Sequence, residues 1–506
     1  MATTTLVDEA RATTRELAPP QDNPHHARRW LVLAVLAVAQ LMVVLDATVV
    51  NIALPTAQHA LSFSDNDRQW IVTAYALSFG SLLLLGGRVA DVIGRKRTFL
   101  IGLAGFAAAS AVGGAAVNFA MLVSARAVQG AFGALLAPAG LALLTTTFTE
   151  SRERARAFGI YGAIAGAGAA IGLLLGGVLT EFASWRWTMF VNLIFAGAAL
   201  IGGFFLLHHR RSEDRPKLDL PGTFTVSAGL FALVYGFSHA TSAGWGNSVT
   251  VAFLVAAAAL ITAFVYTQTR SAHPLLPLRV VLDRNRGGAF FAMFTAAVGM
   301  FGIFLFLTYY LQGILGYSAL RTGVAFLPMV AVLVLSSAVA STALAPRVSP
   351  RILIPGGLAI AAVGMYLLTR LTGHSSFVTA IMPPTMVMGL GMGMIFASAM
   401  SLATLGVAAD DAGVASATVN TAQQVGGSIG TALLNTIAAT AAATYLASHA
   451  VPGGVAQAVL RQAQVHSYVV AFWWSAAIFA AGAALAAVIL RSGVPQPDEN
   501  HTMALV

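Results

Sequence analysis

Cysteine is absent from the 506 residues of the chain, and charged residues make up only 9% of them. The lack of cysteine excludes disulfides, thiolate nucleophiles and cysteine-based metal sites. Lysine is scarce as well, since it occurs only at positions 96 and 217. In a soluble protein, roughly a quarter of all residues would be charged. Because 58% of the residues are hydrophobic, the composition favours a membrane protein.

Long apolar stretches recur from Trp30 almost to the C-terminus. Each is about twenty residues long, which is enough to cross the hydrocarbon core of a bilayer. The runs are continuous rather than alternating, which indicates helices and not the strands of a barrel. We therefore predict an all-α integral membrane protein with fourteen transmembrane helices. The predicted spans are 30–50, 69–87, 98–117, 120–145, 157–180, 187–207, 220–240, 249–268, 288–311, 322–343, 352–371, 377–402, 415–445 and 468–491.

The basic residues predict how these spans are oriented. If the N-terminus lies in the cytoplasm, most of the 28 Lys and Arg residues fall in cytoplasmic segments. Those assigned to the outer side are Arg68, Arg186, Arg321, Arg370 and Arg461. This excess on one side is the positive-inside pattern of membrane proteins. Topology thus explains the net charge of +9, and we expect no nucleic-acid partner.

The spans divide into two groups of six with two spans inserted between them. A basic loop follows the second span of each group, at 87–97 and at 344–351. Parallel repeats of this kind are typical of transporters whose halves rock about a central site. The predicted organisation is a disordered cytoplasmic tail at 1–29, a six-helix bundle at 30–207, cytoplasmic linkers with inserted helices 7 and 8 at 208–287, a second six-helix bundle at 288–491 and a cytoplasmic tail at 492–506.

Two ionisable residues, Asp46 and Arg126, lie deep within predicted spans. A charge at the bilayer centre costs about 2.5–3.5 kcal/mol, so each should face the bundle interior or a wet cavity. Asn51 follows Asp46 in its helix, and Gln129 lies one turn beyond Arg126 on the same face. Asp46 is a candidate proton carrier, because burial and a nearby arginine shift a carboxyl pKa in opposite directions. The alternative is a structural pair that only fixes helix packing.

The loop Gly87–Arg97 fits the pattern G-x-x-x-D-x-x-G-R-[RK]-[RK] completely. On this loop, on Leu45–Pro55 and on Arg126-Ala127-Val128-Gln129-Gly130, the chain resembles the major facilitator superfamily, specifically its fourteen-helix drug:proton antiporters. The resemblance implies the major facilitator fold. It also implies proton coupling at Asp46 and Arg126.

In that family the same loop forms a cytoplasmic latch that governs switching between facing states. The resemblance assigns Gly87, Asp91, Gly94 and Arg95 to this latch. Alternatively, the basic cluster only sets topology. That alternative accounts for Arg95 but not for the two glycines and the aspartate at fixed spacing.

The fifth span carries a glycine pattern that only partly matches the family. Exporters have G-P-x-x-G-G there, and this chain has Gly172, Gly176 and Gly177 without the proline. We expect these glycines to allow close helix approach. They are a candidate switching element of the antiporter type, and the alternative is generic small-residue packing.

Neutral polar side chains are the candidates for a substrate cavity, because the second group of spans has no deep charge. In the thirteenth span, polar residues recur along one face, which could line a cavity or join helices by hydrogen bonds. The candidate cavity residues are Asn51, Gln129, Asn420, Gln424 and Tyr309. A phenylalanine ridge on the ninth span, from Phe290 to Phe304, favours packing over a cavity wall.

We therefore expect proton-coupled efflux of small hydrophobic or amphipathic compounds, such as drugs, antibiotics or secondary metabolites, across a bacterial cytoplasmic membrane. The alternative is proton-coupled uptake or facilitated transport of a small metabolite. No H-E-x-x-H pattern or nucleotide-binding glycine loop appears. We accordingly expect no enzymatic activity, no cofactor, no metal and no obligatory protein partner. The expected partners are a small-molecule substrate, protons and the lipid bilayer.

Overall fold

The computed structural model describes residues 28–64, 67–148, 150–207, 219–271, 274–405, 407, 412–449 and 457–493. These residues form long α-helices with short π-helical turns, and none of them lies in a strand. The predicted all-α class is therefore confirmed. The predicted terminal tails fall almost entirely outside the described residues.

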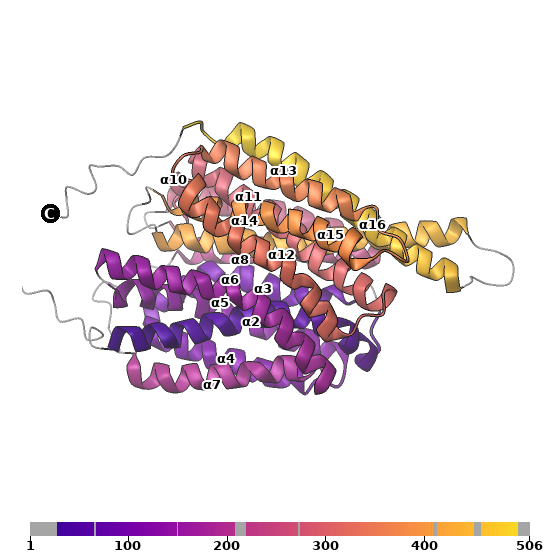
Figure 1. Cartoon of the computed structure of the whole chain (residues 1–506). Coiled ribbons are helices and arrows are strands. Elements are labelled where there is room, and N and C mark those ends of the chain that lie inside the picture. Colours follow the sequence, from indigo (N-terminus) through magenta and orange to yellow (C-terminus); the bar gives the residue numbers. More distant parts are fainter. Residues whose placement is uncertain are drawn as a thin grey trace, which may run out of the picture.

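The helices gather into two bundles, which occupy the lower and upper halves of Figure 1. The first contains α2 (Arg29–Leu61), α3 (Gln69–Ile93), α4 (Arg95–Gly114), α5 (Phe119–Thr147), α6 (Ser151–Phe182) and α7 (Trp187–Leu206). The second contains α11 (Arg284–Tyr309) with η2 (Tyr310–Ile314), α12 (Ala319–Val339) with η3 (Ala340–Leu344), α13 (Pro350–Leu368), η4 (Phe377–Ile381) with α14 (Met382–Thr404), α15 (Ala412–Ser448) and α16 (Gln457–Ile489). The short helix α10 (Leu278–Val281) precedes α11.

Thirteen helices within the described residues are long and apolar enough to cross a membrane. The remaining predicted span, 157–180, lies within α6, whose described apolar part is the shorter segment Ala170–Phe182. Several helices extend beyond their predicted spans, most clearly α2, which continues to Leu61, and α16, which begins at Gln457. The hydropathy of the sequence marks the bilayer-length core of a helix, whereas the helix itself continues into polar flanks.

Polar side chains cap several of these helices and so fix where they begin. Asn118 accepts a hydrogen bond from the backbone of Met121 at the start of α5. Asp283 and Ser318 cap α11 and α12 in the same way. Each cap satisfies a backbone N–H that the helix itself leaves without a partner.

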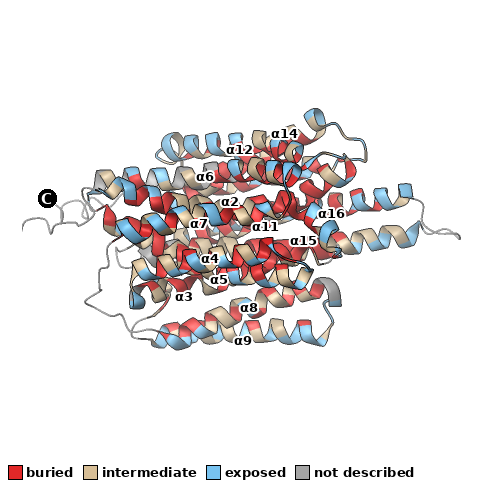
Figure 2. Cartoon of the chain, turned by 90° about the horizontal axis from the view of Figure 1, so that it is seen from below, coloured by how far each residue is buried: buried red, intermediate tan, exposed pale blue. Residues whose placement is uncertain are grey.

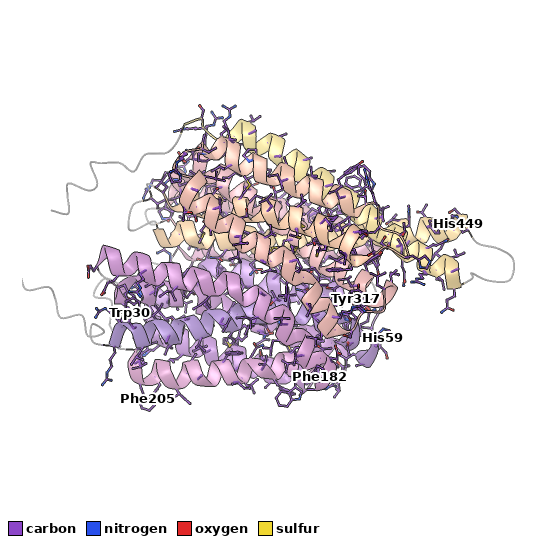
Figure 3. The ribbon with its side chains drawn as sticks, viewed as in Figure 1. Trp30, His59, Phe182, Phe205, Tyr317 and His449 are labelled. Atoms are coloured by element: carbon purple, nitrogen blue, oxygen red, sulfur yellow. The ribbon has the colours of Figure 1, made fainter. Side chains whose placement is uncertain are left out.

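The two ends of the molecule differ in charge. At the left of Figure 1, α2 begins and α16 ends. This end also carries Arg29, which forms an ion pair with Glu153, and the cluster Arg95–Arg97 at the start of α4. We call it the basic end. Figure 3 places Trp30 at this end and His59 and His449 toward the opposite one.

An additional hairpin, formed by α8 (Leu220–Ala243) and α9 (Ser248–Arg270), lies against one side of the molecule (Figure 2). Helix α8 packs on α3 of the first bundle and on α15 of the second. The Ser227 hydroxyl donates to the carbonyl of Ser81 at 2.7 Å, and Val234 packs with Val425 and Ile429. Helix α9 is largely exposed along its outer face, as a lipid-facing helix would be.

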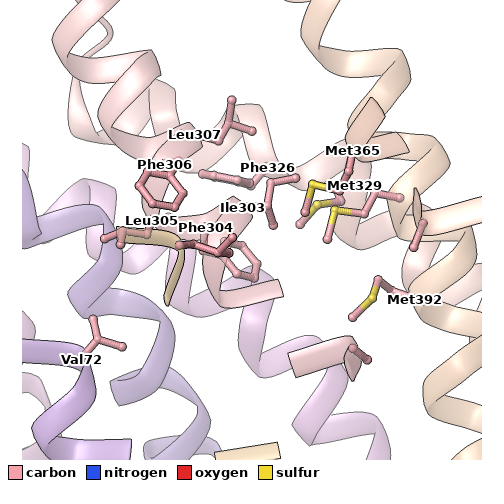
Figure 4. Packing of buried hydrophobic residues seen from close by; sticks show 14 of the residues in the cluster. Val72, Ile303, Phe304, Leu305, Phe306, Leu307, Phe326, Met329, Met365 and Met392 are labelled. Carbon is pink, nitrogen blue, oxygen red and sulfur yellow. The ribbon is translucent and has the colours of Figure 1, made fainter. Parts of the chain in front are cut away.

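The interior of the second bundle is aromatic and rich in methionine (Figure 4). Phe304 and Phe326 pack with their ring centroids 5.1 Å apart, and both are buried. Met329 and Met365 lie in the same cluster. The described members of the phenylalanine ridge on α11 therefore contribute to core packing, as the sequence favours.

Candidate functional site

The site is built around an ion pair between α2 and α5. Nη1 of the Arg126 guanidinium lies 2.6 Å from Oδ2 of Asp46. The side chain of Asp46 is fully buried, and that of Arg126 is 2% exposed. Pairing offsets much of the cost of placing each charge in an apolar interior, so each residue depends on the other. The two deep charges singled out in the sequence thus occupy one site.

The Asp46 carboxylate is further held by two amides from other parts of the bundle. Its Oδ1 accepts hydrogen bonds from Nε2 of Gln129 at 2.7 Å and from Nδ2 of Asn192 at 2.8 Å. Gln129 lies on α5 and Asn192 on α7. Both amides also donate to the hydroxyl of Ser110 on α4. Three helices, α2, α5 and α7, therefore meet at this one carboxylate, and α4 joins them through Ser110.

The Arg126 guanidinium has three further contacts. Its Nε donates to the carbonyl of Ile71 at 3.2 Å, and Nη1 also donates to Oε1 of Gln129 at 2.6 Å. The guanidinium carbon lies 4.3 Å from the centroid of the Tyr75 ring, in a cation–π arrangement. Gly130, which follows Gln129 on α5, lets α5 approach α3 closely, because a Cβ there would meet the backbone of Tyr75.

Three members of this network, Ser110, Asn192 and Tyr75, are not among the predicted site residues. The sequence carried a signal for Asn192, because the segment Phe190-Val191-Asn192 resembles the same family. Ser110 and Tyr75 had none, because the faces that α4 and α3 turn inward depend on tertiary packing. The Tyr75 hydroxyl and Oδ1 of Asn192 are buried and have no hydrogen-bond partner among the described residues.

The structure places the predicted latch residues at the turn between α3 and α4. Gly94 links the two helices with a φ of 97° and a ψ of 137°, a conformation that side chains strongly disfavour. Arg95 donates to the carbonyl of Ala142 on α5 at 3.4 Å. Gly87 lies on α3 opposite Pro138. The side chain of Asp91 lies outside the described part of the structure.

The three predicted glycines of α6 lie at contacts with neighbouring helices. Gly172 and Gly176 face α2, where a Cβ at Gly176 would lie 3.0 Å from the carbonyl oxygen of Val49. Gly177 faces α12 in the other bundle, and a Cβ there would lie 2.6 Å from the Cα of Leu320. Helix α6 thus packs between the two bundles without the proline of the family pattern.

The predicted cavity residues do not share one set of contacts. Gln129 belongs to the Asp46 network, whereas Asn51 donates to the carbonyl of Ala47 in its own helix at 2.9 Å. On α15, Gln424 packs against Gly80 of α3, and Asn420, one turn before it, is half-buried.

Tyr309 instead joins the two bundles toward the end opposite the basic end. Its hydroxyl donates to Oε1 of Gln58 on α2 at 2.6 Å. The Arg68 guanidinium lies 4.0 Å from the centroid of the Tyr309 ring. A further contact in this region is the hydrogen bond from Gln312 to the carbonyl of Ile52, at 3.1 Å.

Comparison with known proteins gives one family. The chain matches the model described as Major Facilitator Superfamily over residues 36–431. It is 49% identical over 480 residues to the puromycin resistance protein pur8 of Streptomyces alboniger, and the match covers 94% of each chain. It is 38% identical over 412 residues to the cephamycin export protein CmcT of Amycolatopsis lactamdurans, covering 80% of this chain and 84% of that protein.

Solved structures share the fold at low sequence identity. A bacterial homologue of the human lysosomal transporter Spinster, in an inward-facing and occupied conformation, aligns with a TM-score of 0.61 and 16% identity over 91% of this chain and 96% of that chain. An auto-inhibited peptide transporter of the POT family aligns with a TM-score of 0.65 and 14% identity over 93% and 98% of the two chains.

Proposed function

Because the chain belongs to the Major Facilitator Superfamily, we propose that it exports small hydrophobic or amphipathic antibiotic-like compounds in exchange for protons. Its relatives are multi-pass bacterial transporters, and among them are antibiotic resistance and export proteins. The observation that carries proton coupling is the buried Asp46–Arg126 pair, set in an otherwise apolar bundle. The resemblance drawn from the sequence motifs is confirmed at the level of the family.

Asp46 is the proposed proton carrier. It is the one carboxylate of the pair, and Arg126 keeps its charge under all relevant conditions because a guanidinium does not deprotonate in proteins. Protonation of Asp46 removes the charge that neutralises Arg126 and weakens the charge-assisted hydrogen bonds from both amides. The site then has a net positive charge inside the bundle, which favours a different arrangement of the helices. A proton that crosses the membrane releases about 2.3 kcal/mol per 100 mV, which supplies the work of export.

The latch and the glycines of α6 are the proposed moving parts. Gly87, Asp91, Gly94 and Arg95 lie at the connection of α3 to α4, where the backbone conformation of Gly94 is demanding. On α6, Gly177 lies against α12 of the second bundle. We propose that the bundles formed by residues 30–207 and 288–491 are the two halves that move relative to each other.

The proposed location is the bacterial cytoplasmic membrane, with both termini in the cytoplasm. The basic end supports this orientation, because basic residues are retained on the cytoplasmic side of membrane proteins. We propose that the substrate contacts residues among the candidate cavity residues, which are Asn51, Gln129, Asn420, Gln424 and Tyr309. Because one relative is a puromycin resistance protein and another a cephamycin export protein, an antibiotic or secondary metabolite is the proposed cargo. Metabolite uptake is the competing function.

The test is puromycin transport in proteoliposomes that hold the full chain under an imposed pH gradient. We expect gradient-driven movement of puromycin with counterflow of protons, and we expect Asp46→Asn to abolish the coupling while puromycin binding persists. The matched control is Asp67→Asn, because Asp67 is a partly exposed carboxylate outside the Asp46 network, and it accepts a hydrogen bond from the hydroxyl of nearby Ser64. Full coupling in Asp46→Asn would refute the carrier role. Movement of puromycin and protons in the same direction would favour uptake.

A further inference from the structure

A groove lies on the outer surface of the first bundle, between α4 and α7. It has a volume of about 490 Å³. Its walls are entirely formed by apolar side chains, among them Leu100, Ile101 and Ala104 of α4 and Ile201, Phe204 and Phe205 of α7. Phe205 is 72% exposed, and Ile201 and Phe204 are each 65% exposed. Figure 3 shows Phe205 directed away from the bundle.

The groove begins at the basic end of the molecule. Helix α4 starts with Arg95, Lys96 and Arg97, and no acidic residue lies in its first turn. Lys96 donates to the carbonyls of Phe204 and Leu207 and so ties the start of α4 to the end of α7. These hydrogen bonds fix the width of the groove at this end.

Arg97 is placed to bind a ligand at the mouth of the groove. It is exposed, and it has no hydrogen bond or ion pair within the described part of the chain. It precedes Ile101 by four residues, so the two side chains lie on the same face of α4, one turn apart. A molecule that follows the groove therefore has its apolar part along Ile101 and Ala104 and its polar part at Arg97.

We propose that the α4–α7 groove binds an anionic phospholipid, with an acyl chain along the apolar walls and the headgroup phosphate at Arg97. A flexible hydrocarbon chain suits walls without polar groups, and an arginine binds phosphate through charge-assisted hydrogen bonds. Three basic side chains in the first turn of α4, which holds no acidic residue, favour a lipid with a net negative charge over a zwitterionic one. The same charge disfavours a cationic amphiphile, so the groove differs from a drug-binding site. The inference does not depend on the proposed transport activity.

Native mass spectrometry of the full chain tests the proposal directly. The protein is titrated with phosphatidylglycerol and, separately, with phosphatidylcholine of the same acyl chains, and the bound lipid is counted. Two variants address the two parts of the site: Arg97→Gln removes the charge at the mouth, and Ala104→Trp fills the groove without changing the charge. Their matched controls are Arg370→Gln, at an exposed arginine near the end of α13, and Ala259→Trp, on the exposed face of α9.

We expect the native chain to retain phosphatidylglycerol in preference to phosphatidylcholine. Arg97→Gln should weaken this retention about fivefold, the contribution of one basic residue near a lipid surface. Ala104→Trp should remove the tightest-bound lipid, and both controls should behave as the native chain. Equal retention of the two lipids, or native retention in either groove variant, would overturn the proposal. A dimer that Ala104→Trp dissociates would show that the groove faces a second copy of the chain instead.

Discussion

Asp46 and Arg126 are 80 positions apart in the sequence, yet Oδ2 of the aspartate and Nη1 of the arginine lie 2.6 Å from each other in the core of the first bundle. Neither charge has access to bulk solvent. The cost of removing one partner is therefore the cost of leaving the other charge buried without compensation. This relationship leads to the first prediction.

Arg126→Gln should lower the free energy of unfolding by about 3–5 kcal/mol, because it leaves the Asp46 carboxylate unpaired. The measurement is thermal unfolding of the purified protein in detergent. The double variant Asp46→Asn/Arg126→Gln should regain much of the lost stability without regaining proton coupling, since neither charge is then left alone. Arg347→Gln serves as the control, because Arg347 is exposed and donates within its own turn. An unchanged unfolding midpoint in Arg126→Gln would contradict this account.

Gly177→Ala should impair transport strongly, because the added methyl group would meet the backbone of Leu320 in the opposite bundle. The bundles would have to separate at this contact, and the transport rate in proteoliposomes reports the change. Gly197→Ala is the matched control. Gly197 is also helical, but nothing lies within 4 Å of a Cβ built there, so alanine should be neutral or stabilise the helix by up to about 1 kcal/mol. Equal transport by the two variants would show that the α6–α12 contact does not limit the cycle.

Gly94→Ala should destabilise the turn between α3 and α4 by about 1–3 kcal/mol, because its backbone conformation is one that alanine rarely adopts. The unfolding midpoint should fall accordingly. Gly87→Ala should leave the midpoint nearly unchanged, since a Cβ there meets only Pro138 at an ordinary distance of 3.7 Å. If Gly87→Ala nevertheless reduces transport, the latch role is supported. If neither variant affects transport, the latch role is wrong.

Tyr309→Phe and Tyr309→Ala should loosen the contact between the bundles to different degrees. Phenylalanine removes the hydrogen bond to Gln58, worth about 1 kcal/mol, but it keeps the ring beneath Arg68. Alanine removes both interactions. The chain has no cysteine, so a single Ile52→Cys can report opening through its rate of reaction with a membrane-impermeant maleimide.

The maleimide reaction should be slowest in the native background, faster with Tyr309→Phe and fastest with Tyr309→Ala. Ile52 is buried, so its label enters only when the bundles part on this side. A control with cysteine at buried Leu36, toward the basic end, should not follow this order. Identical rates in all three backgrounds would mean that Tyr309 does not hold this side closed.

The sequence predicts the number of helices well, because a bilayer imposes both a length and an apolar composition on each span. It also predicts the meeting of Asp46 and Arg126, since two isolated deep charges are most stable next to each other. The roles of Ser110 and Tyr75 could not be predicted, because a serine or tyrosine within an apolar helix carries no sign of which neighbour it faces. Asn51 is the opposite case. Its polar side chain near Asp46 predicted a place in the cavity, yet its amide donates to the carbonyl of Ala47 within its own helix.

The hairpin of α8 and α9 contacts both bundles through apolar side chains, and toward the first bundle it also forms a directed hydrogen bond. One hydrogen bond from the hairpin to the first bundle runs from the Ser227 hydroxyl to the carbonyl of Ser81, and Arg88 of α3 donates to the carbonyl of Pro274 in the segment that follows α9. Toward α15 the contacts include the apolar cluster of Val234 with Val425 and Ile429, to which Leu77 of α3 also belongs. Hydrogen bonds resist displacement because they require a fixed geometry, whereas apolar contact is non-directional. When the halves move, the hairpin should therefore move together with the first bundle as one rigid body. The second bundle should then slide past the hairpin at the interface between α8 and α15.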